Sequence, residues 1–211
     1  MPIQQLNERS LKRACKVLAS EHAELSVVYE TYGTPPLWDR PTGFATLLQI
    51  ILEQQVSLAS AKACFDKLTV RIGEVSPENL LTLTDAEMKT VGFSRQKTAY
   101  ARHLAEALLE NRIDLDSLHK LPDADVKAEL TKLKGVGEWT SDIYLLMAML
   151  RPDVMPKGDI ALHEAYKKLT NGEKRLGSDE FVAIAEKWKP FRSVAARLLW
   201  HFYLSEKVQR R

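Results

Sequence analysis

Cysteine is scarce in this chain, with two residues among 211. Cys15 and Cys64 are far apart in the sequence and show no metal-ligand spacing, so a disulfide framework and a four-cysteine iron–sulfur cluster are both excluded. There is no run of about 18 apolar residues, which a transmembrane helix would require. Residues 1–10 are polar and lack the apolar core of a signal peptide. We therefore expect an intracellular protein that does not bind a membrane.

A strong charge of either sign is also missing. The chain has 30 basic and 28 acidic residues, which gives a formal net charge of +2 at pH 7. This balance neither requires nor excludes a nucleic-acid partner, because a local basic face would be sufficient. The length is enough for one compact domain or for two lobes that share a core.

Helical periodicity, in contrast, runs through the whole sequence. Apolar residues recur at positions i, i+3, i+4 and i+7, which is typical of the apolar stripe of an amphipathic helix. No alternating strand pattern and no Asn-Gly hairpin turn is present. The sequence therefore predicts an all-α fold of roughly ten short helices. The periodic stretches are 11–18, 25–32, 44–51, 101–108, 143–150, 162–169 and 195–202.

A tight turn, Gly135-Val136-Gly137, joins two predicted helices at 123–132 and 139–150. Its glycines allow a positive φ and a close approach of the backbone to a partner. Because the turn opens a helix, its N–H groups favour a phosphate, and Lys132 and Lys134 add positive charge beside it. Such a contact would be independent of DNA sequence. The alternative is a helix–helix corner in which the glycines serve steric needs alone.

Four segments carry a resemblance to a known family. Residues 133–140, Leu-Lys-Gly-Val-Gly-Glu-Trp-Thr, resemble the hairpin of the helix-hairpin-helix (HhH-GPD) DNA glycosylase superfamily. Residues 50–57, 155–162 and 188–193 resemble further segments of its alkyladenine branch, the 3-methyladenine DNA glycosylase II type. The matches follow one another in order over 35–204, which is nearly the whole chain.

This resemblance implies one HhH-GPD domain over residues 1–211, built of two helical lobes with the active-site cleft between them. The central lobe would cover 41–155 and include the hairpin at 131–140. The terminal lobe would combine 1–40 with 156–211.

Asp159 is the candidate catalytic residue. Cleavage of an N-glycosidic bond develops positive charge on the deoxyribose, and a fixed carboxylate stabilises that charge or deprotonates the attacking water. An alkylated purine that already carries a positive charge leaves readily, so a second carboxylate is not needed as a general acid. Asp159 could instead simply cap the predicted helix at 162–169.

Trp139 bears on the type of reaction. Relatives that also cut the DNA backbone carry a lysine at this hairpin position and form a Schiff base there. Trp139 has no amine, so the resemblance implies base release that leaves an abasic site, on substrates of the 3-methyladenine and 7-methylguanine class. Two alternatives stay open: a non-catalytic DNA-binding module, and a glycosylase for uracil or oxidised bases.

A flipped base needs a stacking pocket, and electron-rich rings attract a cationic base. The candidates are Trp139, Trp200, Trp38 and Tyr144, of which the family pattern supports the first two. Ile143 stands where the family often has a tyrosine, which leaves the shape of the pocket open. Any of these rings could instead belong to the core.

Further DNA contacts are expected from three side chains. Gln55 matches the position that plugs the gap left by a flipped nucleotide, although it could be a solvated helix end. Thr140 begins the helix after the hairpin. His163 lies one turn beyond Asp159 and could contact it or the DNA, or could fill space.

No cofactor is expected. The resemblance implies one possible structural ion, a Na⁺ or K⁺ held by the backbone carbonyls of Thr131, Leu133 and Val136. The expected partner is double-stranded DNA that contains damaged bases, bound by a monomer. The location would be the cytoplasm or nucleoid of a bacterium, or the nucleus of a eukaryote.

Overall fold

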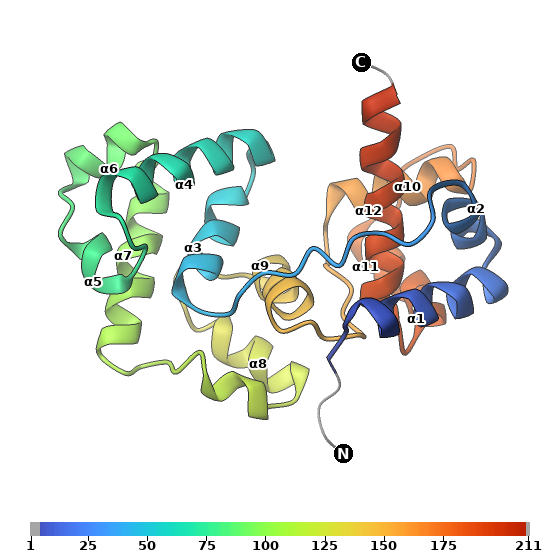
Figure 1. Ribbon diagram of the computed structural model, residues 1–211, viewed down its shortest axis with the longest axis horizontal. Helices are drawn as coiled ribbons and strands as arrows, with labels where there is room; N and C mark the ends of the chain where they lie inside the picture. The colour runs from blue at the N-terminus through green and yellow to red at the C-terminus, as the bar shows by residue number, and fades with distance from the viewer. Residues whose placement is uncertain (1–4, 210–211) are drawn as a thin grey trace. The chain divides into compact units, whose positions relative to one another are not determined.

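The computed structural model describes residues 5–209, and within this range the chain is helical and contains no strand (Figure 1). The all-α prediction is therefore confirmed, and six of the seven periodic stretches lie inside α-helices. The α-helices are α1 Glu8–Glu21, α2 Ala23–Tyr32, α3 Phe44–Glu53, α4 Leu58–Ile72, α5 Pro77–Leu81, α6 Asp85–Val91, α7 Arg95–Leu109, α8 Asp123–Leu130, α9 Glu138–Ile143, α10 Ile160–Leu169, α11 Ser178–Ala185 and α12 Arg192–Gln209. Short 3₁₀ helices cover Ser117–Lys120 and Glu186–Trp188.

The chain folds into two compact units. Unit 1 comprises residues 1–39 and 145–211, and unit 2 comprises residues 40–144. The second boundary thus lies at 144, whereas the sequence suggested 155. Residues just after it belong to unit 1 because Leu150 accepts a hydrogen bond from the N–H group of Leu6 at 2.7 Å.

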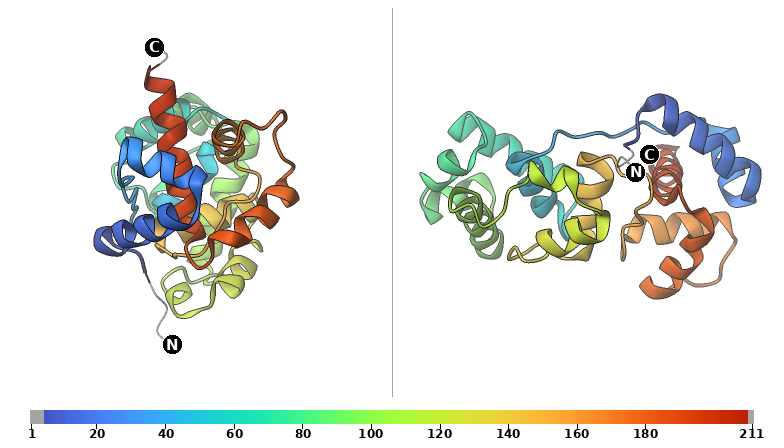
Figure 2. Two further views of the ribbon diagram at one scale, coloured as in Figure 1. Left: turned by 90° about the vertical axis from the view of Figure 1, so that its right-hand side faces the viewer. Right: turned by 90° about the horizontal axis from the view of Figure 1, so that it is seen from below.

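Unit 1 is arranged around α12. This helix packs against α1, α2 and α10, and residues 193–200 along it are buried (Figure 2). Rings from α10, α11 and the following 3₁₀ helix form an aromatic cluster. In it, the ring centroid of Phe181 lies 5.7 Å from that of Tyr166 and 6.1 Å from that of Trp188. The indole N–H group of Trp188 donates to Glu24 on α2. No helix among residues 5–209 is long and apolar enough to cross a membrane.

Arg197 is a fully buried cation at the centre of this unit. Its Nε donates to the Leu37 carbonyl at 2.8 Å, and its two Nη atoms donate to the carbonyls of Ser193 and Leu146 at 3.1 and 2.7 Å. Burial lowers the pKa of Arg197 to about 10, so the group stays charged at neutral pH. Leu37 and Leu146 lie close in sequence to the two places where the chain passes between units.

Unit 2 packs α3 against α4, α7 and α9. Capping side chains define the starts of α5 and α6: Ser76 caps α5 through the N–H of Asn79, and Thr84 and Glu87 form a capping box at α6. An ion pair between a half-buried lysine and a buried aspartate joins α8 to α9, with Lys127 Nζ 2.8 Å from Asp142 Oδ1. Asp142 is 1% exposed, so this pair fixes the two helices that flank the turn at 135–137.

The helix predicted over 139–150 is present as far as Ala148, but it does not stay α-helical. The α-helix ends at Ile143, and a π-helix follows over Tyr144–Ala148. Leu150 then has a left-handed backbone, with φ of +54°. Two carbonyls of the π-helix accept hydrogen bonds from residues outside it. Arg197 donates to Leu146, and the N–H of Arg151 donates to Leu145 at 3.0 Å. Apolar spacing alone does not reveal such a change of helical pitch.

We predict that Arg197→Met lowers the free energy of unfolding by about 3 kcal/mol or more, because carbonyls in three segments lose a buried donor and each orphaned group costs about 1–3 kcal/mol. Urea denaturation measures this. Arg13→Met is the matched control, since Arg13 is exposed on α1 and its loss should cost no more than about 0.5 kcal/mol. Equal losses in the two variants would contradict the role given to Arg197.

Candidate active site

The residues selected from the sequence fall in both units. Unit 2 holds the Gly135–Gly137 turn, Gln55 and Trp139, and unit 1 holds Asp159, Trp200 and Trp38. The two parts are described in turn.

The two glycines of the turn have different structural roles. Gly135 has a φ of +88°, and a Cβ atom added there would lie 2.3 Å from the ring of Tyr100. Gly137, the N-cap of α9, has an extended φ of −100°, and an added Cβ would meet no atom within 4 Å. The prediction of a positive φ thus holds for Gly135 and is wrong for Gly137. Only Gly135 is required by the fold itself.

The remaining hairpin residues are partly engaged in the turn. The side chain of Val136 is buried, and its N–H group donates to the Leu133 carbonyl at 3.0 Å, so this N–H is already used. Lys132 pairs with Glu129 at 2.6 Å on the surface. The backbone N–H of Lys134 donates to Nδ1 of His103 at 3.2 Å, while its side chain is exposed. Within the hairpin, Lys132, Lys134 and Gly137 are therefore the exposed members of the predicted DNA-contacting set.

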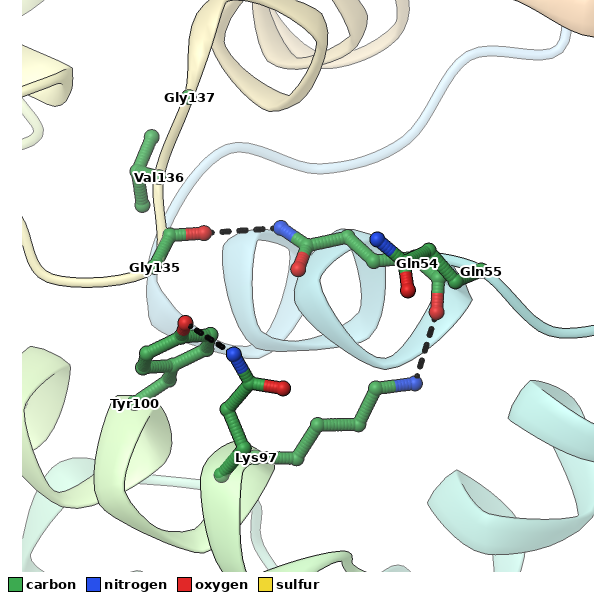
Figure 3. A pocket seen from close by; sticks show the side chains of 8 residues that line it. Gln54, Gln55, Lys97, Tyr100, Gly135, Val136 and Gly137 are labelled. Atoms are coloured by element: carbon green, nitrogen blue, oxygen red, sulfur yellow. Dashed lines mark hydrogen bonds between the residues drawn. The ribbon is translucent and has the colours of Figure 1, made fainter.

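Gln54 was not selected from the sequence, yet it contacts the turn directly (Figure 3). Its Nε2 donates to the Gly135 carbonyl at 2.8 Å and to Thr140 Oγ1 at 2.7 Å. Thr140 is 2% exposed and accepts this bond, which corrects the prediction that its side chain contacts DNA. Nothing in the local sequence distinguishes Gln54 from its neighbour, because its partners lie more than 80 positions away.

A hollow of about 380 Å³ lies beside the turn. Lys97 Nζ closes one side of it by donating to the carbonyls of Leu52 at 2.6 Å and Gln54 at 3.0 Å, and burial lowers the pKa of Lys97. Gln55 is exposed and has a left-handed φ of +56°. The lining residues are Gln54, Gln55, Gln96, Lys97, Tyr100, Gly135, Val136 and Gly137.

Two rings near the hairpin have different surroundings. Trp139 is half-buried in the first turn of α9. Tyr144 is fully buried, and its hydroxyl accepts a hydrogen bond from the Gly43 N–H at 2.9 Å. Burial raises the pKa of Tyr144. The prediction that Tyr144 lines a base pocket does not agree with this placement, since its ring has no exposed surface for a ligand to touch.

Asp159 is the N-cap of α10 and also has a second partner. Its Oδ1 accepts from the Leu162 N–H at 3.1 Å, which is the helix cap, and from the indole Nε1 of Trp200 at 3.2 Å. Gly158, just before it, has a φ of +80°. Capping and a fixed carboxylate are therefore compatible, because both donors share one oxygen of the side chain.

Trp200 and Trp38 lie together beside this carboxylate. Trp200 is 8% exposed, and its ring meets that of Trp38 edge to face, with centroids 6.4 Å apart. Trp38 is less buried and has a left-handed φ of +49°. The sequence did not reveal the hydrogen bond between Trp200 and Asp159. The predicted place of Trp200 in a base pocket stays a prediction.

His163 is a core residue. It is 5% exposed, its ring lies 4.4 Å from that of Phe181, and Nδ1 lies 3.0 Å from the Leu176 carbonyl. This corrects the prediction of a DNA contact, because the surrounding residues of unit 1 enclose the side chain. Helical spacing placed His163 one turn after Asp159 but could not show that this face of α10 points inward.

Comparison with known proteins identifies the family of this chain. The family model of the HhH-GPD superfamily base excision DNA repair proteins matches residues 48–190 of this chain. The chain belongs to this superfamily. The matched range includes the turn, Gln54, Gln55 and Asp159.

Individual HhH-GPD relatives support this assignment. YfjP of Bacillus subtilis is 26% identical over 184 residues, which cover 83% of this chain and 64% of YfjP. DNA-3-methyladenine glycosylase 1 of Schizosaccharomyces pombe is 28% identical over 161 residues, which cover 74% of this chain and 71% of that protein. This chain therefore spans about two thirds of the length of either relative.

A solved HhH-GPD structure shares the fold. The 3-methyladenine DNA glycosylase Mag1 of Schizosaccharomyces pombe, solved in complex with abasic DNA, superposes with a TM-score of 0.82. The two chains are 23% identical, and their alignment covers 92% of this chain and 97% of Mag1. The all-α HhH-GPD fold predicted from the sequence is thereby confirmed.

The predicted cation site of this HhH-GPD chain stays a prediction. Of the three carbonyls, that of Leu133 already accepts from Val136, although a carbonyl oxygen has a second lone pair. Among residues 5–209, no group of three or more His, Cys, Asp or Glu side chains is placed to hold a metal ion.

We predict that Gly135→Ala destabilises the protein and that Gly137→Ala does not. The first change forces an alanine into a left-handed conformation, which costs about 1–3 kcal/mol, and drives its Cβ into the Tyr100 ring. The second places a methyl group in open space and should change stability by less than about 0.5 kcal/mol. Urea denaturation of both variants tests this, and an equal loss in both would be inconsistent with the geometry of the turn.

Proposed function

We infer that this HhH-GPD protein is a DNA glycosylase that releases alkylated bases, of the 3-methyladenine and 7-methylguanine class, in base excision repair. The observation that carries this inference is the Asp159 carboxylate, held by the N–H groups of Leu162 and Trp200. A binding module would need no such carboxylate. The names of relatives such as DNA-3-methyladenine glycosylase 1 support the same substrate class.

Asp159 would act on the sugar of the damaged nucleotide. As the glycosidic bond breaks, positive charge develops on the deoxyribose, and a carboxylate already fixed in place stabilises it without reorganisation. The same group can orient and deprotonate the water that completes hydrolysis. The base departs as a neutral molecule when its glycosylated form is cationic, so no general acid is required.

The other residues bind and hold the DNA. The turn at Gly135–Gly137 and Lys134 would bind the phosphate backbone, and exposed Gln55 would fill the gap left by the everted nucleotide. The indole ring of Trp139 would stack on the base, and its electron-rich face favours a cationic base over uracil or an oxidised base. Trp139 offers no amine for a Schiff base, so the strand should stay intact.

The direct test is release of bases from methylated duplex DNA by purified protein without added cofactor. We expect 3-methyladenine or 7-methylguanine in the product and a strand that breaks only after alkali. A parallel panel of uracil and oxidised bases tests the alternative substrates. DNA binding with no release from any substrate would instead indicate a binding module.

The protein should act as a monomer, in a bacterial nucleoid or a eukaryotic nucleus.

We predict that Asp159→Asn lowers the single-turnover rate of base release by about 10²–10⁴-fold, the range typical of a lost acid–base group. Asparagine keeps an oxygen that accepts from Leu162 and Trp200, so the cap and the fold should persist. Affinity for abasic duplex DNA, measured by fluorescence anisotropy, should change little. A variant with full activity would remove Asp159 from the mechanism.

We also predict that Trp200→Phe slows base release by about 10-fold or more, because a hydrogen bond to a charged group is worth about 1.5–3 kcal/mol. Trp188→Phe is the matched control, since Trp188 is also buried in unit 1 and its indole donates to another carboxylate, Glu24. The control should lose stability but keep its single-turnover rate. If both variants slow base release equally, the loss reflects packing and not the position of Asp159.

A further inference from the structure

Gln54 occupies a junction of three segments in unit 2. It is the C-cap of α3, and its backbone carbonyl accepts a hydrogen bond from Lys97 Nζ of α7 at 3.0 Å. The same ammonium group donates to Leu52 at 2.6 Å. Lys97 is partly buried, and this burial lowers its pKa. The two bonds from Lys97 hold the end of α3 to α7.

The side chain of Gln54 reaches in a different direction. Its one amide nitrogen carries two hydrogens, and these serve the Gly135 carbonyl at 2.8 Å and Thr140 Oγ1 at 2.7 Å. Gly135 lies in the turn and Thr140 lies in α9, so the two bonds hold both sides of Gly137. Figure 3 shows the bond to Gly135 crossing directly from the end of α3 to the turn.

Gln55, the next residue, has a left-handed backbone with a φ of +56° and an exposed side chain. A non-glycine residue persists in this conformation when its surroundings determine it. Here the preceding residue is fixed at its carbonyl by Lys97 and at its amide by the turn. The point from which Gln55 extends is therefore set by the same side chain that holds the turn.

We propose that Gln54 is a positioning residue that fixes the backbone of the turn at Gly135–Gly137 relative to Gln55. The turn can then bind a phosphate group while Gln55 fills the gap in the same DNA, because the distance between the two is fixed. The proposal rests on the proposed function, because it assigns those two DNA contacts. Gln54 itself touches neither the base nor the sugar in this scheme.

The chemistry of the junction suits an amide of this length. A glutamate would place an acceptor against the Gly135 carbonyl, and a methionine would offer no donor at all. The hollow beside the turn also provides a matched control in Gln96, whose Nε2 donates to the Tyr100 hydroxyl at 2.6 Å within α7. Gln54→Glu and Gln96→Glu add the same charge to the same hollow, so general repulsion of DNA is equal in both.

The experiment compares these two variants with the wild type in two measurements. The first is the single-turnover rate of base release, which a misplaced contact lowers by up to about 100-fold. The second is the ratio of affinities for a duplex with a tetrahydrofuran abasic analogue and for an undamaged duplex. We expect Gln54→Glu to lose about 10- to 100-fold in rate and most of the affinity ratio, and Gln96→Glu to lose at least several-fold less in each.

A second pair, Gln54→Met and Gln96→Met, repeats the comparison without the added charge and carries the test if Gln54→Glu does not fold. Near-ultraviolet circular dichroism at the assay temperature establishes which variants are folded. Equal effects in the Gln54 and Gln96 pairs would overturn the proposal, as would a normal affinity ratio in folded Gln54→Met. Wild-type protein that binds the abasic duplex but releases no base would overturn the proposed function alone, because the affinity ratio still tests Gln54.

Discussion

Unit 1 depends on one buried guanidinium group. Arg197 donates to the carbonyls of Leu37 and Leu146, and so holds two distant stretches of chain against α12. It also donates to the Ser193 carbonyl within that helix. The bond to Leu37 fixes the residue before Trp38. The ring of Trp38 packs on that of Trp200, which lies one turn after Arg197 in α12. Trp200 in turn donates to Asp159. In the proposed mechanism, the position of the Asp159 carboxylate thus follows, contact by contact, from an arginine that would never meet the substrate.

Asp159 shows how one side chain can meet a structural and a chemical requirement together. A helix cap needs an acceptor fixed at the first turn, and stabilisation of a sugar cation needs a carboxylate that does not move. Both are met here because the cap and the indole bond fall on the same oxygen, Oδ1. In the proposed mechanism, Asp159 is both a capping and a catalytic residue, so the two interpretations of the local sequence do not exclude each other.

Apolar periodicity predicted the helical class, and the resemblance of four ordered segments to a known family predicted the HhH-GPD fold and its hairpin. Sequence alone missed Gln54 and the indole bond of Trp200, and it misjudged His163, Thr140 and Tyr144. Each of these depends on a partner between 13 and about 100 positions away. Local patterns do not specify which face of a short helix is buried, nor where a helix changes pitch, as it does after Ile143.

A substitution at Gly137 would affect the protein differently from one at Gly135. The fold leaves the space beside it empty and gives it an ordinary backbone, so nothing inside the protein requires glycine there. An alanine there would yield a protein that a cell makes, folds and keeps at normal abundance, since quality control responds to instability and not to lost contacts with DNA. Defects at this position would be visible only where DNA is damaged, while defects at Gly135 would first appear as missing protein.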